Sequence, residues 1–86
     1  MNISEDAFTK SVSHFVSEAR VWSKRGSTEQ VKYALRSLHG IAMVAAFGGV
    51  SAQLEETIQK AIGEVIQLLA DTSNAEITRI AGGAAS

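Results

Sequence analysis

Apolar side chains recur every three or four residues along most of the chain. In the first third they fall at Phe8, Val12, Phe15, Ala19 and Trp22. This spacing gathers apolar side chains on one side of an α-helix, whereas a half-buried strand would alternate with a period of two. Gly26 follows Lys24 and Arg25, which is a favourable C-terminal ending. The pattern therefore predicts a first helix that ends at Gly26.

Two further stretches repeat the pattern. Their apolar residues are Val31, Leu35, Leu38, Ala42 and Ala45, then Leu54, Ile58, Ala61, Val65 and Leu68. Gly48 and Gly49 separate the stretches, and glycine is common just after a helix. Ser51 is placed to cap the third helix, and residues 27–30 have the spacing of a capping box at the start of the second.

Polar residues interrupt the pattern after residue 70. Asp71 to Asn74 is predicted to be a loop, and Ser73 to Glu76 has the spacing of a second capping box. A short fourth helix with Ile77 and Ile80 follows, and residues 82–86 are expected to be a flexible tail. Because short connections make neighbouring helices antiparallel, we expect an all-α antiparallel bundle of three long helices plus a short C-terminal helix, in one domain over residues 1–81.

Composition agrees with a small folded domain. The chain has 86 residues, is 45% apolar and carries a formal net charge of −1. It has no cysteine, which excludes disulfides and thiolate metal sites, and no proline to interrupt long helices. The first residues lack the basic start and apolar core of a signal peptide, and the longest apolar run, residues 41–50, is too short to span a membrane. We expect a cytoplasmic protein.

The second predicted helix is apolar on both sides in its C-terminal half. With Leu38 at the centre of the buried side and about 100° per residue, the opposite side carries Arg36, Gly40, Met43 and Phe47. A helix that is apolar all round is enclosed on both sides. The fourth helix could cover Met43 and Phe47, or these side chains could bind another protein or a second copy of the chain.

Basic residues gather at one end of the predicted bundle. The turn at Gly26 brings together Arg20, Lys24, Arg25 and Lys32. Such a cluster could bind the phosphates of a nucleic acid or an acidic partner. No nucleic-acid-binding motif accompanies it, so a solvated end of the bundle is the competing interpretation.

Few residues suit catalysis or metal binding. His14 and Glu18 lie one helical turn apart, but a catalytic zinc site needs three protein ligands. The sequence has no P-loop, dinucleotide-binding glycine motif, H-E-x-x-H motif or nucleophile elbow. A narrow bundle also leaves little room for a cleft. We expect no enzymatic activity, no cofactor and no metal site.

The stretch from Ala34 to Ala42 resembles the motif of histidine phosphotransfer domains. In that family the central helix of a bundle presents a phosphorylatable histidine in the pattern His, any residue, Leu, Lys, Gly. Leu38 and Gly40 match this pattern, with Arg36 at the histidine position and His39 at the lysine position. Because arginine does not carry the phosphoryl group, the resemblance in this register implies a surface that only docks an acidic receiver domain.

A second register of the same motif makes His39 the phosphate acceptor. Ala42 and Met43 then replace the lysine and the glycine of the pattern. The sequence as a whole predicts a non-enzymatic regulatory or signalling protein that binds a partner, or a second copy of itself as a homodimer, through the outer side of its second helix. A phosphorelay module using His39 and a nucleic-acid-binding protein remain alternatives.

Overall fold

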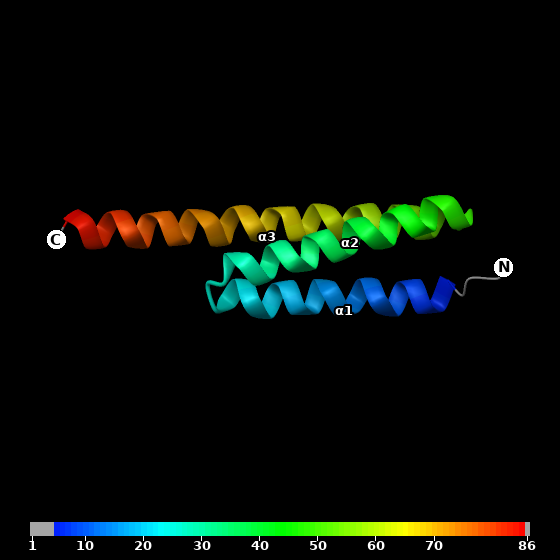
Figure 1. The fold of residues 1–86 in the computed structure, drawn as a ribbon, viewed down its shortest axis with the longest axis horizontal. Coiled ribbons are helices and arrows are strands. Elements are labelled where there is room, and N and C mark those ends of the chain that lie inside the picture. The colour runs from blue at the N-terminus through cyan, green and yellow to red at the C-terminus, as the bar shows by residue number, and fades with distance from the viewer. Residues whose placement is uncertain (1–4, 86) are drawn as a thin grey trace.

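Three helices make up residues 5–85, the part of the chain that the structure describes; its side chains are described for residues 5–80. In this computed structural model they are α1 (Glu5–Lys24), α2 (Thr28–Gly48) and α3 (Ala52–Ala85) (Figure 1). Within that range only residues 25–27 and 49–51 are not helical, and no strand occurs. The all-α prediction is confirmed.

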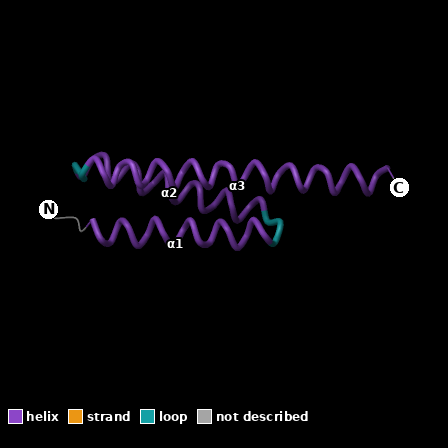
Figure 2. Tube along the Cα trace, turned by 180° about the vertical axis from the view of Figure 1, so that it is seen from behind, coloured by secondary structure: helices purple, strands orange, loops and turns teal. Residues whose placement is uncertain are grey.

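Both connections are short, and the chain turns back at each of them (Figures 1 and 2). Gly26 and Gly49 have positive φ angles of 74° and 67°. Glycine adopts this left-handed conformation without the steric cost that a Cβ atom brings. The helix ends therefore lie at the glycines where the sequence predicts them.

Polar contacts define how the helices lie against one another. Side-chain hydrogen bonds join α1 to the chain around α3 at three levels, pairing Glu5 with Ser51, Arg20 with Glu64, and Ser23 with Thr72. Residue numbers rise together in these pairs, so α1 and α3 run in the same direction. At the start of α2, the Thr28 hydroxyl donates a 2.7 Å hydrogen bond to Glu76 of α3.

The core lies where the three helices meet. Its buried apolar residues are Phe8, Val12, Val16, Ala19, Val31, Ala34, Leu38, Ala45, Leu54, Ile58, Ala61, Ile62 and Val65. Most of them belong to the predicted apolar stripes. Val16 is buried where the pattern favoured Phe15, and Phe15 and Trp22 pack at the edge of the core as half-buried rings.

The predicted loop at Asp71 to Asn74 and the separate short C-terminal helix are wrong. α3 continues without interruption through this segment to Ala85. Thr72 is buried, and its hydroxyl bonds the Leu68 carbonyl and the Ser23 hydroxyl, each at 2.6 Å. Because these contacts satisfy its polar groups within a helix, the segment does not need a turn to satisfy them. Residues 82–85, expected as a tail, lie in the helical backbone of α3, and Ser86 lies outside the described residues.

Serine caps one helix as predicted but not the other. Ser51 Oγ accepts a 3.2 Å hydrogen bond from the backbone N–H of Leu54, which satisfies a donor in the first turn of α3. Ser27 stands at the N-cap of α2 in an extended conformation, but its side chain makes no capping hydrogen bond. The predicted capping box is wrong in its hydrogen bonds, although α2 begins at Thr28.

α3 is much longer than its neighbours and projects beyond them (Figure 1). It has 34 residues against 20 in α1 and 21 in α2, so at about 1.5 Å per residue it exceeds them by roughly 20 Å. The Cα atoms fill a rod of 59 × 16 × 16 Å. No helix within the described residues combines the length and apolarity needed to cross a membrane.

Candidate functional site

The outer face of α2, defined as Arg36, Gly40, Met43 and Phe47, is open to solvent. Met43 is 63% exposed and Phe47 88% exposed, and the neighbouring Val44 is 53% exposed. The C-terminal part of α3 continues away from this region instead of folding back over it (Figure 1). Of the two explanations that the sequence allowed for Met43 and Phe47, cover by a fourth helix is excluded.

Gly40 lies at the centre of this face. A methyl group placed on Gly40 would meet no atom within 4 Å. The glycine is therefore not required by close packing inside the bundle. Because glycine has no side chain, Gly40 leaves a depression on the surface of α2. Arg36 lies one turn before it, and Met43 and Val44 lie one turn after it.

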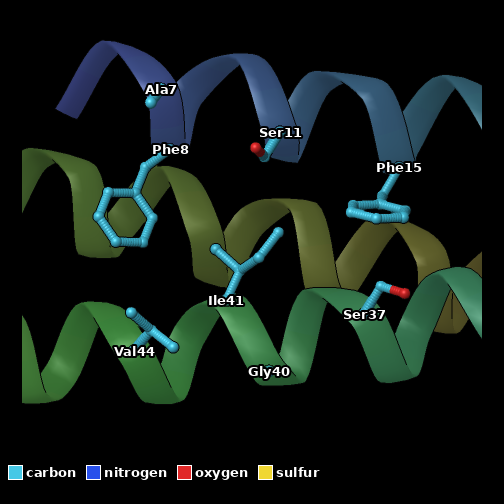
Figure 3. Close-up of a pocket in the computed structure, with 8 residues that line it drawn as sticks. All are labelled: Ala7, Phe8, Ser11, Phe15, Ser37, Gly40, Ile41 and Val44. Carbon is cyan, nitrogen blue, oxygen red and sulfur yellow. The ribbon is translucent and has the colours of Figure 1, made fainter. Parts of the chain in front are cut away.

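An apolar groove borders the outer face, between α1 and α2. It has a volume of about 480 Å³ and is lined by Ala7, Phe8, Ser11, Phe15, Ser37, Gly40, Ile41 and Val44. In Figure 3 the two phenylalanine rings reach from α1 toward α2, and Ile41 reaches back between them. Gly40 and Val44 belong both to this groove and to the exposed side of α2, so the two features form one continuous surface.

The sequence does not predict this groove. Small side chains at Ser11, Ser37 and Gly40 leave the space, but they lie on two helices whose facing register the sequence does not give. The feature of the sequence that could have indicated the groove is a small residue on each helix, at a position where a larger apolar residue would fill the interface. Phe8 and Phe15 carried a second signal, because two aromatic rings on one stripe need more room than the small side chains opposite them fill.

His39 and Arg36 are both exposed on α2. Neither side chain makes a hydrogen bond or ion pair with another described residue. The imidazole of His39 is therefore accessible from solvent, next to Gly40 along the helix. Both residues that the two registers of the resemblance set at the acceptor position are thus on the surface.

The basic cluster is not a set of free donors. Arg20 binds Glu64 across two helices, with Nη2 2.9 Å from Oε1. Arg25 stacks over the Trp22 ring at 5.1 Å, and Lys32 pairs with Glu29 at 3.7 Å. Of the four residues only Lys24 has no such contact among the described residues. Carboxylates of the chain itself thus already pair with two of the four cations, Arg20 and Lys32.

The contact between Arg20 and Glu64 also shifts the pKa of both side chains. The hydrogen bond from Arg20 lowers the pKa of the Glu64 carboxyl, and the same bond raises the pKa of Arg20. Both side chains remain about half exposed, at 57% for Arg20 and 41% for Glu64. The pair is a surface contact between α1 and α3, so water and salt screen it.

No metal centre is assembled in the described part of the chain. His14 Nε2 lies 3.9 Å from Glu18 Oε1, which is an ion-pair distance for a protonated imidazole. Glu18 also accepts a hydrogen bond from the Trp22 indole at 3.2 Å. Across the described residues, no three His, Cys, Asp or Glu side chains converge in a way that could hold an ion.

Comparison of the chain with protein-family models, with curated proteins and with solved structures gives no match.

Proposed function

We propose that this chain is a non-enzymatic binding module that docks another protein on the outer face of α2. The observation that carries the proposal is the exposure of Phe47 and Met43, 88% and 63%, one helical turn apart. Aromatic and methionine side chains are enriched in protein interfaces, because association removes their large apolar surface from water. A chain that docks without catalysing a reaction suits a regulatory or signalling role.

The surroundings of these two side chains support docking. Gly40 leaves a low point in the middle of the face, and the apolar groove beside it offers a recess for an inserted side chain. Arg36 has no acidic neighbour bound to it among the described residues, so it can pair with a carboxylate at the edge of an interface. The face therefore fits a partner that brings apolar side chains flanked by acidic ones.

Substitution of Phe47 tests the proposal. Phe47→Asp should leave helical content and melting temperature nearly unchanged, because the side chain is exposed and contributes little to the fold. The dissociation constant for a partner captured by the wild-type chain and then purified should rise by about 30-fold or more, as for an interface hot spot. Circular dichroism and calorimetric titration measure the two effects.

The matched control is Asn74→Asp, which adds the same charge at an exposed position of α3 with almost no change in shape. It should bind the partner like the wild type. Equal binding by Phe47→Asp and Asn74→Asp would refute the outer face of α2 as the docking site. A large fall in the melting temperature of Phe47→Asp would show instead that Phe47 supports the fold.

A phosphorelay module is the second candidate, favoured by the exposure of Arg36, His39 and Gly40 on one helix. In that reaction a receiver domain's aspartyl phosphate would pass its phosphoryl group to an imidazole nitrogen of His39, and the aspartate carboxylate would leave. We expect the docking function without this transfer, because Arg36 stands at the acceptor position in one register of the motif, and Ala42 and Met43 depart from the motif in the other.

Incubation with a phosphorylated receiver domain distinguishes the two candidates. A docking-only chain should bind the receiver and gain no acid-labile phosphate, as measured by mass spectrometry under neutral conditions. Label on the wild type that is absent from His39→Gln would establish the phosphorelay function instead. Retention of label by His39→Gln would place the acceptor elsewhere.

A further inference from the structure

The projecting end of α3 carries apolar side chains that are mostly exposed in the described structure. Thr28, at the start of α2, contacts Glu76, so residues from 77 onward lie past the end of α2. Ile77 is 64% exposed and Ile80 62% exposed. A lone helical segment this short is marginal in water, since most helix stability in proteins comes from packing an apolar face.

These isoleucines continue a stripe that begins inside the bundle. Going back from Ile80, steps of three and four residues lead to Ile77, Ser73, Leu69 and Ile66. At about 100° per residue, these five positions fall within an arc of roughly 80° on α3. Ile66 is 50% exposed, and Leu69 and Ser73 are half-buried. The stripe is therefore a second apolar side of α3, partly open along its whole length.

We propose that this stripe pairs with the same stripe of a second copy of the chain, with the two α3 helices running in opposite directions about a two-fold axis at Ser73. The spacing is symmetric about that residue, because Leu69 and Ile77 lie four positions away on either side, and Ile66 and Ile80 lie seven. Antiparallel pairing thus sets Ile66 opposite Ile80 of the other copy and Leu69 opposite Ile77.

Self-complementarity is what selects a second copy as the occupant. A two-fold interface places one surface patch against the identical patch, so residue i meets j and j meets i. Because its spacing is symmetric about Ser73, the stripe meets this requirement when an identical copy runs antiparallel to it.

Charged residues do not oppose this pairing. The charged residues of the paired segment have other neighbours: Glu64 binds Arg20, Asp71 accepts from Gln67, Glu76 accepts from Thr28, and Arg79 lines a recess with Ser23 and Gly26. None lies at a stripe position. Opposite each Glu76 the two-fold axis sets Ala70 of the other copy, three positions on the other side of Ser73, so two carboxylates do not meet.

The contact area predicts a weak, reversible dimer. Pairing about Ser73 overlaps residues 61–85 of the two copies, a length of about 37 Å at 1.5 Å per residue. With a helix diameter of about 10 Å, the footprint is roughly 370 Å² per copy. A stable interface buries about 800 Å² per partner. The dimer should therefore appear only at high concentration, with a dissociation constant in the range of about 10 µM to 1 mM.

Sedimentation equilibrium over that concentration range tests the inference. The wild type should pass from monomer to dimer, and Ile80→Asp should weaken the dimer at least about tenfold, because it sets a charge against Ile66 of the other copy. Thr78→Asp is the matched control, since it adds the same charge to the same projecting segment but off the stripe. It should dimerise like the wild type, and all three chains should remain helical.

Cysteine cross-linking tests the position of the axis, and the natural chain contains no cysteine to interfere. Ser73→Cys should form a disulfide-linked dimer under mild oxidation, because the axis brings the two thiols together. Asn74→Cys, one residue around the helix, should remain monomeric. A linked dimer from Asn74→Cys as readily as from Ser73→Cys would refute pairing about Ser73.

The remaining outcomes separate this inference from the proposed function. A chain that stays monomeric up to about 1 mM overturns the α3 pairing and leaves docking on α2 untouched. A dimer that Phe47→Asp abolishes and Ile80→Asp does not would place self-association on the outer face of α2, which also overturns the pairing. A dimer sensitive to Ile80→Asp alone supports the pairing, whatever partner α2 binds.

Discussion

Three glycines of this chain have equally open surroundings but different backbone conformations. A methyl group on Gly40, Gly49 or Gly63 would meet no atom within 4 Å. Gly40 and Gly63 are inside helices, where glycine is less favourable than alanine by about 1 kcal/mol. Gly49 has a φ angle of 67°, in the left-handed region that a side chain disfavours. Conformation alone should therefore decide what alanine does at each position.

Alanine substitutions at these positions should therefore change the free energy of unfolding in opposite directions. Gly63→Ala and Gly40→Ala should each raise the free energy of unfolding by roughly 0.5–1 kcal/mol, whereas Gly49→Ala should lower it by about 1 kcal/mol. Urea unfolding followed by circular dichroism measures all three. If Gly40 serves docking, Gly40→Ala should also bind the partner less tightly while being more stable, and Gly63→Ala should bind normally. Stabilisation by Gly49→Ala would contradict the left-handed conformation.

The Arg20–Glu64 pair should make part of the stability depend on pH. The pKa of Glu64 is lowered in the folded chain, chiefly by its hydrogen bond with Arg20. A carboxyl with a lowered folded pKa stabilises the fold above its unfolded pKa, near 4.3, and that contribution is lost as the pH falls through the folded value. Because the pair is solvent-exposed, the effect should be small.

Glu64→Gln tests this contribution. At pH 7 and low salt its melting temperature should lie a few degrees below that of the wild type. The difference should shrink as the pH drops below about 4, and also with added salt. Glu56→Gln, which breaks an exposed pair within one turn of α3, is a control for general loss of a surface charge. A difference that grows toward low pH would contradict the lowered pKa.

At the scale of the element, spacing predicted α1 and α2 well and the end of α3 poorly. Glycines mark the ends of the first two helices, and their φ angles confirm why. No glycine or proline marks residues 70–77, and the predicted loop there rested on local preferences of Ser73 and Asn74. Contacts with α1 and α2 outweigh those preferences, and such long-range contacts are invisible in a single sequence.

The candidate site on α2 was likewise predictable from the sequence only in part. The positions of Met43 and Phe47 on the outer side of α2 follow from helical geometry, so the sequence was enough to place them. Whether anything covered them depended on where the C-terminal residues go. The groove depended on which small residues of α1 and α2 face each other, and only the assembled structure gives that register.

At the scale of the whole molecule, the chain is a rod whose two ends differ. Its Cα radius of gyration is 15.4 Å, whereas a compact domain of this length would have about 12 Å. One end holds Phe47 and the hydrogen bond between Glu5 and Ser51. The other is the projecting segment of α3. The two apolar surfaces thus lie at separate places, so a chain paired through α3 can still dock a partner through α2.

Hydrogen exchange should report this asymmetry directly. At about 1 µM, below the dissociation constants expected for the dimer, backbone amides beyond Glu76 should exchange fast, because Ile77 and Ile80 on this segment are mostly exposed. Amides around Ile58 and Val65, both fully buried, should exchange slowest. Raising the concentration should slow exchange near Ile77 if the α3 pairing holds. Slow exchange beyond Glu76 at low concentration would show that another contact covers the segment.

The polar pairs between α1 and α3 have a consequence for how the bundle chooses one alignment over its neighbours. The apolar stripes repeat every three to four residues, so sliding α1 along α3 by one turn would bring new apolar side chains into similar contact. Such a slip of about 5.4 Å would separate Arg20 from Glu64 and Ser23 from Thr72. Hydrophobic burial holds the helices together but would be similar in the slipped alignment. These hydrogen bonds form only in the native alignment and therefore favour it.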